Sequence, residues 1–384
     1  MILPSHFGAL LGGAEYQAKL LIDHLAATDA YEIYYLARFT NPESLTNGHT
    51  VITIGGLPSL RRFGYFFDAL NLLAALKRVR PDVIYQRVGC AYTGVCALYA
   101  RQTGCPMIWH IASDIEVTPQ PELKRVVMMH KALEKWLLEY GIRNATCIVA
   151  QTMQQAAMLE THYGRQALKV IPNFQPTPRE ACATKSDTVQ IVWIANFKRL
   201  KRPEVFLQLA RDFADRKDVE FIMVGDISAD RMWQESVDQE LAQLSNVRRL
   251  GRVRQDEVNE LLARSHVLVN TSDYEGFSNT FIQAWLRNVV VVSYRVNPDG
   301  VFDQDRLGIC AGGSYESLRC SVLRLVEDSA LRSAFVGRAL PEARENHSMR
   351  NIESIRITID ALVKQSANSR LLGYEERGTS EPDR

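Results

Sequence analysis

The stretch HVLVNTSDYEGFSNTFIQAWLRNVVVVSYR, residues 266–295, combines two apolar segments with a polar loop and a short helical pattern between them. Residues 266–270 are mostly apolar and β-prone, residues 279–287 have the spacing of a short amphipathic helix, and residues 289–293 are a continuous apolar run. Such a run is typical of a strand that is buried on both faces of a parallel sheet. The stretch therefore predicts a βαβ unit whose polar chemistry is confined to the loop after its first strand.

That loop is the predicted ligand site. In open α/β sheets ligands bind beyond the carboxyl ends of the strands, where a helix N-terminus offers unpaired N–H groups and a partial positive charge. Gly276 allows close backbone approach, and Ser278 and Asn279 can cap the helix. Glu275 adds a carboxylate, which is a poor partner for phosphate but a good acceptor for sugar hydroxyls. The loop indicates a phosphate joined to a polyol, with an ordinary capped turn as the alternative.

The segment DYEGFSNTFIQAW, residues 273–285, resembles the signature loop of glycosyltransferase family 4, whose members are retaining enzymes of the GT-B fold that use nucleotide-sugar donors. The resemblance implies a role near the donor sugar for Glu275. It implies further donor contacts from the residues that follow, Gly276, Phe277, Ser278, Asn279 and Thr280. The family has a second glutamate on the nucleotide ribose, and Gln283 occupies that position here. A glutamine amide still has an acceptor and adds donors, so it can hold a ribose diol, and we interpret Gln283 as a tolerated variant. Because an amide lacks the charge-assisted strength of a carboxylate, weaker or altered donor binding is the alternative.

Two glycines, Gly12 and Gly13, precede a helical pattern over residues 14–27. Paired glycines before a helix permit close backbone approach to an anion. The resemblance implies that this loop faces the donor diphosphate. Only residues 1–3 precede Pro4, so we expect a very short first strand or a truncated chain start.

The loop after the apolar run at residues 189–195 is basic and enters the next helix at Pro203, a favoured first-turn residue. The family has an arginine and a lysine in this loop that neutralise the donor diphosphate. Lys201 falls on the lysine position, Asn196 falls on the arginine position, and Arg199 is a nearby candidate to compensate. The alternative is a solvated basic turn.

His110 ends a predicted strand in the first half of the chain. The resemblance implies that it contacts the donor sugar, and a histidine with a purely structural role is the alternative.

Length and composition favour a two-domain globular protein. At 384 residues the chain exceeds what one hydrophobic core usually serves. With 46% hydrophobic residues, 23% charged residues and a formal net charge of +1, no attraction to nucleic acid is expected. The chain has neither an apolar run of about 18 residues nor a secretion signal, so we expect a cytoplasmic protein. Seven cysteines without a CxxC pair indicate neither a disulfide framework nor a zinc site.

Strand and helix patterns alternate in two series. The predicted strands of the first series are residues 31–36, 51–54, 83–87, 107–111, 146–150 and 168–171, and those of the second are residues 189–195, 219–224, 247–250, 266–270 and 289–293. We predict an α/β chain of the GT-B type, with two Rossmann-like domains that face a central cleft. These are an N-terminal acceptor domain (1–172), a linker (173–188), a C-terminal nucleotide-sugar-binding domain (189–345), a helix (346–367) and a disordered tail (368–384).

The combined prediction is a retaining glycosyltransferase. It would move a hexose-type sugar from a UDP- or GDP-linked donor to a hydroxyl of a glycan or lipid-linked acceptor, in surface polysaccharide or glycolipid synthesis. The catalytic candidates are His110, Lys201 and Glu275. The chain has no DxD-like motif after a strand, so we expect no metal or other cofactor, and the diphosphate charge must be met by helix N-termini and Lys201.

Other functions and partners stay open. A non-catalytic nucleotide-sugar-binding relative is an alternative because of Asn196 and Gln283, and a nucleotide-sugar epimerase is a further one. The segment at residues 61–80 combines arginine and lysine with aromatic residues, a composition that fits peripheral contact with an anionic membrane. An ordinary amphipathic core helix is the alternative for that segment.

Overall fold

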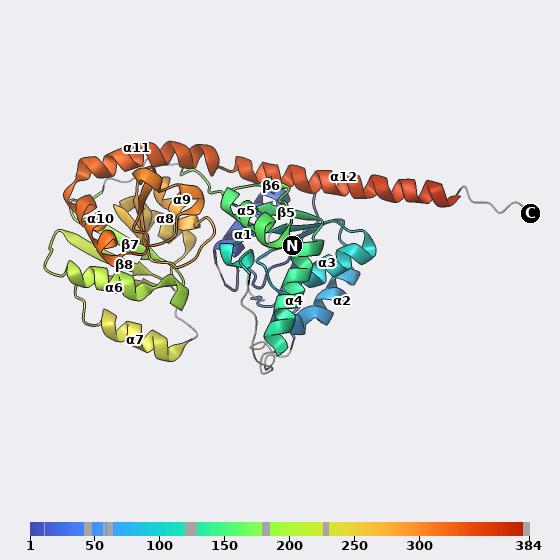
Figure 1. Cartoon of the computed structure of the whole chain (residues 1–384), viewed down its shortest axis with the longest axis horizontal. Coiled ribbons are helices and arrows are strands. Elements are labelled where there is room, and N and C mark those ends of the chain that lie inside the picture. The colour runs from blue at the N-terminus through green and yellow to red at the C-terminus, as the bar shows by residue number, and fades with distance from the viewer. Residues whose placement is uncertain are drawn as a thin grey trace, which may run out of the picture. The chain divides into compact units, whose positions relative to one another are not determined.

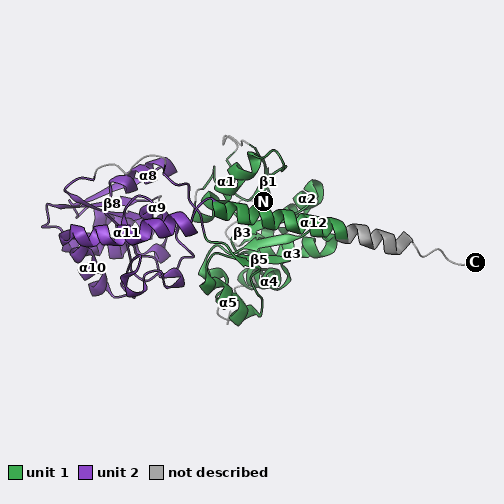
Figure 2. Cartoon of the chain, turned by 90° about the horizontal axis from the view of Figure 1, so that it is seen from above, with its two compact units in different colours: residues 1–172, 350–384 green, residues 173–349 purple. Residues whose placement is uncertain are grey.

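The computed structural model describes residues 1–10, 12–41, 48–56, 59, 64–119, 129–178, 185–225 and 230–378, with the backbone alone at residues 129 and 369–378. The chain divides into unit 1, Met1–Pro172 with Arg350–Arg384, and unit 2, Asn173–Met349 (Figure 2). Each unit has a parallel sheet with helices packed against it (Figure 1). The predicted α/β class with two Rossmann-like units is therefore confirmed.

The strands of unit 1 are β1 (Tyr34–Ala37), β2 (Thr50–Thr53), β3 (Ile84–Arg87), β4 (Met107–His110), β5 (Cys147–Ala150) and β6 (Lys169–Val170). β1 pairs with β2, and β3 to β6 pair in sequence order, all in parallel. Ile2 joins the two groups through parallel bridges to Leu36 and Gln86. Its N–H donates to the carbonyl of Tyr85 at 2.9 Å. The short first strand expected from the sequence is thus an isolated bridge at the centre of the sheet.

The helices of unit 1 are α1 (Gly13–Ala26), α2 (Ala69–Val79), α3 (Ala91–Thr103), α4 (Met129–Asn144), α5 (Met153–Tyr163) and α12 (Arg350–Gly378), with 3-10 turns η2 (Tyr65–Asp68) and η3 (Asp114–Glu116). α3 and α4 pack with their backbones close together. A Cβ added at Gly94 would collide with the carbonyl of Leu137, and one at Gly141 would lie 2.5 Å from the carbonyl carbon of Thr93. Glycine is therefore required at both crossing points.

The C-terminal region differs from the predicted helix at residues 346–367 and disordered tail at residues 368–384. Helix α11 (Ser329–Asn346) ends at the residue where the predicted helix would begin. The next helix, α12, begins at Arg350, belongs to unit 1 and continues to Gly378. Tyr31 Oη donates to Asp360 Oδ1 at 2.6 Å, which fixes α12 near α1. The prediction took the polar composition of residues 368–384 as a sign of disorder, but residues 368–378 contain no proline, and the helix continues through them.

Unit 2 contains β7 (Val189–Ile194), β8 (Val219–Val224), β9 (Val247–Gly251), β10 (Val267–Asn270), β11 (Val290–Ser293) and β12 (Gly308–Cys310), in the order β12-β11-β10-β7-β8-β9. Its helices are α6 (Pro203–Asp212), α7 (Arg231–Leu241), α8 (Gln255–Arg264), α9 (Asn279–Trp285), α10 (Tyr315–Glu327) and α11 (Ser329–Asn346), and its 3-10 turns are η5 (Arg199–Lys201), η6 (Pro298–Gly300) and η7 (Asp303–Asp305). Val267 and Val269 of β10 belong to one core cluster and Leu268 to another, so both faces of the sheet are buried. The predicted βαβ unit is β10, α9 and β11.

Candidate functional site

The carboxyl ends of β7 and β10 bring two loops together in unit 2. The strands are neighbours in parallel register, with Val267 opposite Ile191. The loop after β7 contains η5 and leads into α6, and the loop after β10 leads into α9. Because parallel neighbours end at the same edge of a sheet, the loops meet there. The N–H of Asp273 donates to the carbonyl of Leu200 at 2.8 Å, which joins the two loops directly.

Lys201 and Glu275 form an ion pair where these loops meet. The Lys201 ammonium contacts Glu275 Oε1, and each side chain is 17% exposed. The same oxygen accepts a hydrogen bond from Ser272 Oγ at 2.8 Å and one from Asn270 Nδ2 at 3.4 Å. Within the described part of the chain, Glu275 Oε2 makes no hydrogen bond. The carboxylate is thus fixed by one oxygen, and the other can accept from a ligand.

Arg202 shapes the loop that carries Lys201. It adopts the left-handed conformation, with φ 49° and ψ 51°, at the N-cap of α6. Its Nε donates to Glu204 Oε1 at 2.5 Å, and its Nη1 donates to Asp273 Oδ1 at 3.3 Å. The hydrogen bond with Glu204 is the main cause of a raised pKa for Arg202. Arg202 and Asp273 were not predicted from the sequence, because neither lies in a motif that indicates contact between two loops.

The start of α9 differs from prediction in two details. Ser278 occupies the N-cap but makes no cap hydrogen bond, and its Oγ lies 3.0 Å from Thr280 Oγ1. Phe277 was predicted to contact the donor, but its ring is 5% exposed and packs 4.3 Å from the ring of His347, centroid to centroid. An apolar ring gains more from core burial than from contact with a charged donor. The carbonyl of Phe277 accepts a hydrogen bond from Asn173 Nδ2 at 2.7 Å, and Asn279 is the first residue of α9. Contact of Gly276, Phe277 and Asn279 with a donor stays a prediction.

Gln283, on the predicted ribose position, lies inside unit 2. Its side chain is 2% exposed, and its Nε2 donates to Asn259 Oδ1 at 3.0 Å. Asn259 lies on α8, and no pattern in the sequence indicates that it pairs with Gln283. The contact between Gln283 and ribose stays a prediction.

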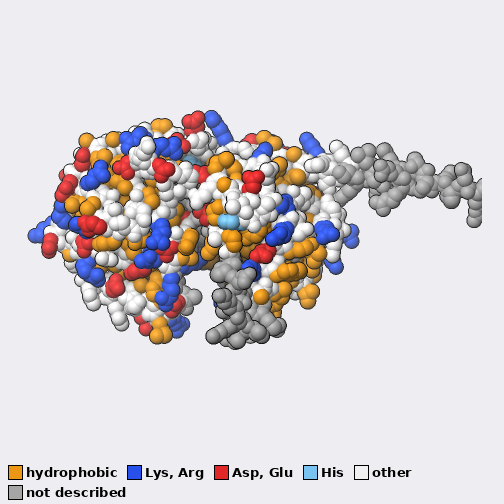
Figure 3. Space-filling model, in the orientation of Figure 1, with side chains coloured by type: hydrophobic (Ala, Val, Ile, Leu, Met, Phe, Trp, Pro, Cys, Tyr) orange, Lys and Arg blue, Asp and Glu red, His pale blue; other side chains and the backbone are white. Residues whose placement is uncertain are grey.

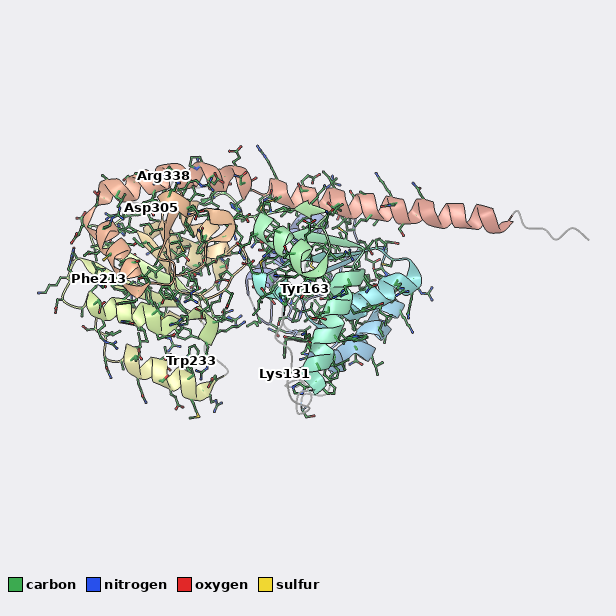
Figure 4. All side chains as sticks on the ribbon, in the orientation of Figure 1. Lys131, Tyr163, Phe213, Trp233, Asp305 and Arg338 are labelled. Carbon is green, nitrogen blue, oxygen red and sulfur yellow. The ribbon has the colours of Figure 1, made fainter. Side chains whose placement is uncertain are left out.

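Arg199 is directed away from the Lys201–Glu275 pair. Its guanidinium donates twice to Asp230 Oδ2, from Nε at 3.1 Å and from Nη2 at 2.8 Å, and its side chain is 69% exposed. The guanidinium also lies 5.5 Å from the ring of Trp233, which is on α7 (Figure 4). The hydrogen bond from Arg199 lowers the pKa of Asp230. The structure brings Lys201 to Glu275 but does not bring Arg199 to them, and Asn196 lies half-buried after β7.

The remaining candidates belong to unit 1. His110 ends β4 and is 1% exposed, with Nδ1 2.6 Å from Tyr85 Oη. Burial, reinforced by the nearby charge of Arg87, holds the pKa of His110 well below its usual range, so the imidazole is neutral. Its Nε2 has no hydrogen-bond partner among the described residues. Tyr85 was not singled out from the sequence.

The predicted glycine pair opens α1. Gly12 is the N-cap residue in extended conformation, and its carbonyl accepts from Tyr16 N at 3.0 Å. A Cβ at Gly12 would lie 2.5 Å from Glu15 Oε2, so the glycine leaves room for the Glu15 carboxylate over the first turn. Gly13 is the first helical residue. Contact of this loop with a diphosphate stays a prediction.

Both halves of the chain match models of glycosyltransferase families. Residues 188–328 match the family model described as glycosyl transferases group 1, and residues 11–177 match the model described as glycosyltransferase family 4. The chain is 26% identical over 164 residues to the gpi3 subunit of phosphatidylinositol N-acetylglucosaminyltransferase from Schizosaccharomyces pombe. That match covers 40% of this chain and about a third, 34%, of the relative.

Solved structures share the fold at low sequence identity. Anabaena HepE in complex with UDP and glucose has a TM-score of 0.73 and 16% identity, with 94% of this chain and 99% of that chain covered. WaaG, a glycosyltransferase involved in lipopolysaccharide biosynthesis, has a TM-score of 0.74 and 14% identity, with 93% of this chain and 98% of that chain covered. At these identities the likeness shows the fold.

Proposed function

Because the chain belongs to the group 1 glycosyltransferases, we propose that it transfers a hexose-type sugar, with retention of configuration, from a nucleotide-sugar donor to a hydroxyl of a glycan or lipid-linked acceptor. The observation that carries this proposal is the Lys201–Glu275 pair at the carboxyl ends of β7 and β10. It supplies a cation suited to a diphosphate and a carboxylate suited to sugar hydroxyls within one pair of loops. Those are the two chemical parts of a nucleotide-sugar donor.

Lys201 stabilises the charge that develops on the diphosphate as the sugar leaves. Loss of one such contact costs about 3 to 4 kcal/mol, by analogy with other stabilised oxyanions. Glu275 Oε2 accepts from a hydroxyl of the donor sugar while Oε1 stays held by Ser272 and Asn270. The leaving phosphate helps to take the proton of the acceptor hydroxyl on the same face, so the reaction uses no obligatory protein nucleophile. The roles of His110, Gly12 and Gly13 toward the donor rest on family resemblance.

Metal independence is part of the proposal. Lys201 and backbone N–H groups at helix starts provide the positive charge that a metal ion would otherwise supply. Turnover by protein dialysed against EDTA should match that of untreated protein. A loss that added Mg²⁺ or Mn²⁺ restores would contradict this part of the proposal.

UDP-linked sugars are the proposed donors. Support comes from the solved structures of HepE, which are described in complex with UDP and glucose and with UDP-glucose. A thermal-shift screen against UDP, GDP, ADP and their common sugars tests this, since a ligand at about 100 times its dissociation constant adds roughly 2.7 kcal/mol to the folded state. A shift selective for UDP compounds supports the proposal, and a shift selective for GDP or ADP compounds would reassign the donor.

Two other functions are distinguished by their products. A nucleotide-sugar epimerase converts the donor without any acceptor, so product analysis in the absence of acceptor detects it. A non-catalytic relative binds the donor and never turns it over. Asn196 and Gln283 differ from the residues that the family has at these positions, and Gln283 is buried. Both observations favour a test for the non-catalytic relative.

A lipid-linked acceptor at a membrane surface is the last part of the proposal. Relatives named for phosphatidylinositol and for lipopolysaccharide biosynthesis support it. Within the residues that the structure describes, none of the helices has the length and apolarity needed to span a bilayer. α2 buries Leu72 and Leu76 as an ordinary core helix does. The segment at residues 61–63 lies outside the described residues.

α4 is the better candidate for peripheral contact. Leu133 is 39% and Trp136 58% exposed, and the Trp136 ring stacks 5.8 Å from that of Tyr140. Lys131 and Lys135 are on the same helix, and Lys135 pairs with Glu139 at 3.8 Å. Figure 3 shows apolar side chains with basic ones scattered among them on the face of unit 1 that is turned to the viewer. Exposed tryptophan beside lysine suits the interface of an anionic bilayer.

Flotation with anionic liposomes tests this surface. Trp136→Ser should reduce retention of the protein. Met232→Ser is a matched control because Met232 is 84% exposed on α7 of unit 2. Equal retention of the wild type and Trp136→Ser would remove α4 from the proposal.

A further inference from the structure

We propose that Thr271 is a positioning residue that holds Lys201 at the donor site by binding the main-chain carbonyl of Lys201. This inference rests on the proposed role of Lys201 toward the donor diphosphate. Thr271 follows β10 directly and is fully buried. Its Oγ1 donates to the carbonyl of Lys201 at 2.6 Å and accepts from Trp193 Nε1 at 2.8 Å.

The indole of Trp193 determines which way the Thr271 hydroxyl points. A threonine hydroxyl has one proton and two lone pairs, whereas an indole N–H can only donate. The bond from Trp193 therefore occupies a lone pair of Oγ1 and leaves the single proton for the Lys201 carbonyl. Trp193 lies in β7, is 1% exposed and packs 5.3 Å from Phe197, centroid to centroid. The hydroxyl is thus anchored on a rigid part of the core.

Lys201 needs such an anchor because the turn around it is irregular. It ends the three-residue η5, and the next residue, Arg202, has the left-handed conformation that non-glycine residues rarely adopt. The preceding carbonyl, of Leu200, accepts from Asp273 N at 2.8 Å. Two successive carbonyls of the turn are therefore bound to the β10 loop, one by a backbone N–H and one by the side chain of Thr271.

Thr271 also links the two halves of the ion pair. It lies in the loop that carries Glu275, and its partner is the main chain of Lys201. A long, flexible lysine side chain reaches a diphosphate reproducibly only if its main chain is fixed. The hydroxyl of Thr271 therefore sets the position from which the Lys201 ammonium acts, although it has no role of its own toward a ligand.

Thr271→Val removes the hydroxyl and keeps the shape of the side chain, and Thr271→Ser keeps the hydroxyl. We expect Thr271→Val to weaken UDP binding and lower kcat by about tenfold each, the effect of one lost hydrogen bond, and Thr271→Ser to stay within about threefold of wild type. Thr358→Val is the matched control. Thr358 is a buried threonine of unit 1 whose hydroxyl donates to a backbone carbonyl at 2.8 Å. Its substitution should leave kcat and UDP affinity unchanged.

A double-mutant cycle separates positioning from general loss of structure. In a Lys201→Ala background, Thr271→Val should have no further effect on UDP affinity, because the side chain that it positions is gone. An additive effect would overturn the inference. So would a folded Thr271→Val with normal kcat and affinity. If Thr271→Val does not fold, Trp193→Phe, which removes the indole donor together with part of a buried ring, should lower UDP affinity in the same Lys201-dependent way, whereas its loss of packing should lower stability whether or not Lys201 is present.

Hydrogen exchange distinguishes failure of this inference from failure of the proposed function. Thr271→Val should speed amide exchange over residues 198–202 whether or not UDP is the ligand, and unchanged exchange there would overturn the positioning role. If exchange speeds up but Lys201→Ala binds UDP as wild type does, the proposed function of Lys201 is wrong and the anchoring of its loop stands.

Discussion

Replacement of Glu275 by glutamine should tighten the binding of free UDP while it slows sugar transfer. The Lys201 ammonium is paired with Glu275 Oε1, so a diphosphate must share this cation with a carboxylate. Glutamine has the same shape and keeps an acceptor for the hydroxyl of Ser272, but it carries no charge. The substitution frees Lys201 for the diphosphate and removes a nearby negative charge at the same time.

The size of the effect follows from the environment of the pair. Both side chains are 17% exposed, which lies between the interior and bulk water. A carboxylate and a phosphate charge about 7 Å apart in an effective dielectric of about 40 repel by about 1 kcal/mol. UDP should therefore bind about fivefold more tightly to Glu275→Gln than to wild type. Transfer should fall by about 10- to 100-fold, since a hydrogen bond to a charged acceptor contributes about 1.5 to 3 kcal/mol.

Isothermal titration calorimetry with UDP on wild type, Glu275→Gln and Lys201→Ala provides the assay. Lys201→Ala should weaken UDP binding by more than tenfold, because it removes a charged contact with the diphosphate. Such a contact contributes about 3 kcal/mol at most to the binding free energy. The two variants are thus expected to change affinity in opposite directions, and the difference should shrink at high salt. Weaker UDP binding by a folded Glu275→Gln, or normal transfer by it, would refute the reasoning.

Three further predictions concern other parts of the chain. Arg199→Ala should change kcat by less than about threefold and the free energy of unfolding by less than about 0.5 kcal/mol, because the ion pair of Arg199 with Asp230 is exposed. Steady-state kinetics and urea unfolding measure these two quantities. Burial lowers the pKa of His347 from 6.5 to about 4, so on acidification the unfolded chain takes up a proton that the folded state refuses. The free energy of unfolding should therefore be about 2 kcal/mol lower at pH 5 than above pH 6.5. In urea unfolding, His347→Gln should show a smaller decrease of this free energy between pH 7.5 and pH 5 than the wild type does. Gly94→Ala should lower the free energy of unfolding by about 3 kcal/mol or more, since the added methyl meets the carbonyl of Leu137, and a thermal melt equal to that of wild type would contradict the packing of α3 on α4.

The sequence allowed the βαβ unit at residues 266–295 to be predicted because its periods and its polar loop are local features. β12, at Gly308–Cys310, was missed because three residues are too few to carry a period. The end of α12 at Gly378 was missed as well, because the polar composition of residues 368–384 was taken as a sign of disorder.

The types of residue in the candidate site could be predicted from the sequence, but the directions in which their side chains point could not. Lys201 and Arg199 lie in one basic turn, and only the backbone conformation directs Lys201 to Glu275 and Arg199 to Asp230. The Trp193–Thr271 bond depends on β7 lying beside β10. Strands so distant in sequence become neighbours through the crossovers of the sheet, which no local pattern encodes.

Sugar transfer itself tests the central claim most directly. The chain would be incubated with radiolabelled UDP- and GDP-sugars and a membrane lipid extract, and label in the lipid product would be measured for wild type and Lys201→Ala. We predict that one UDP-sugar labels a product with the wild type, and that Lys201→Ala reduces this labelling by at least about 100-fold. Wild-type protein that binds UDP by calorimetry yet yields no labelled product from any donor would contradict the assignment of an active transferase.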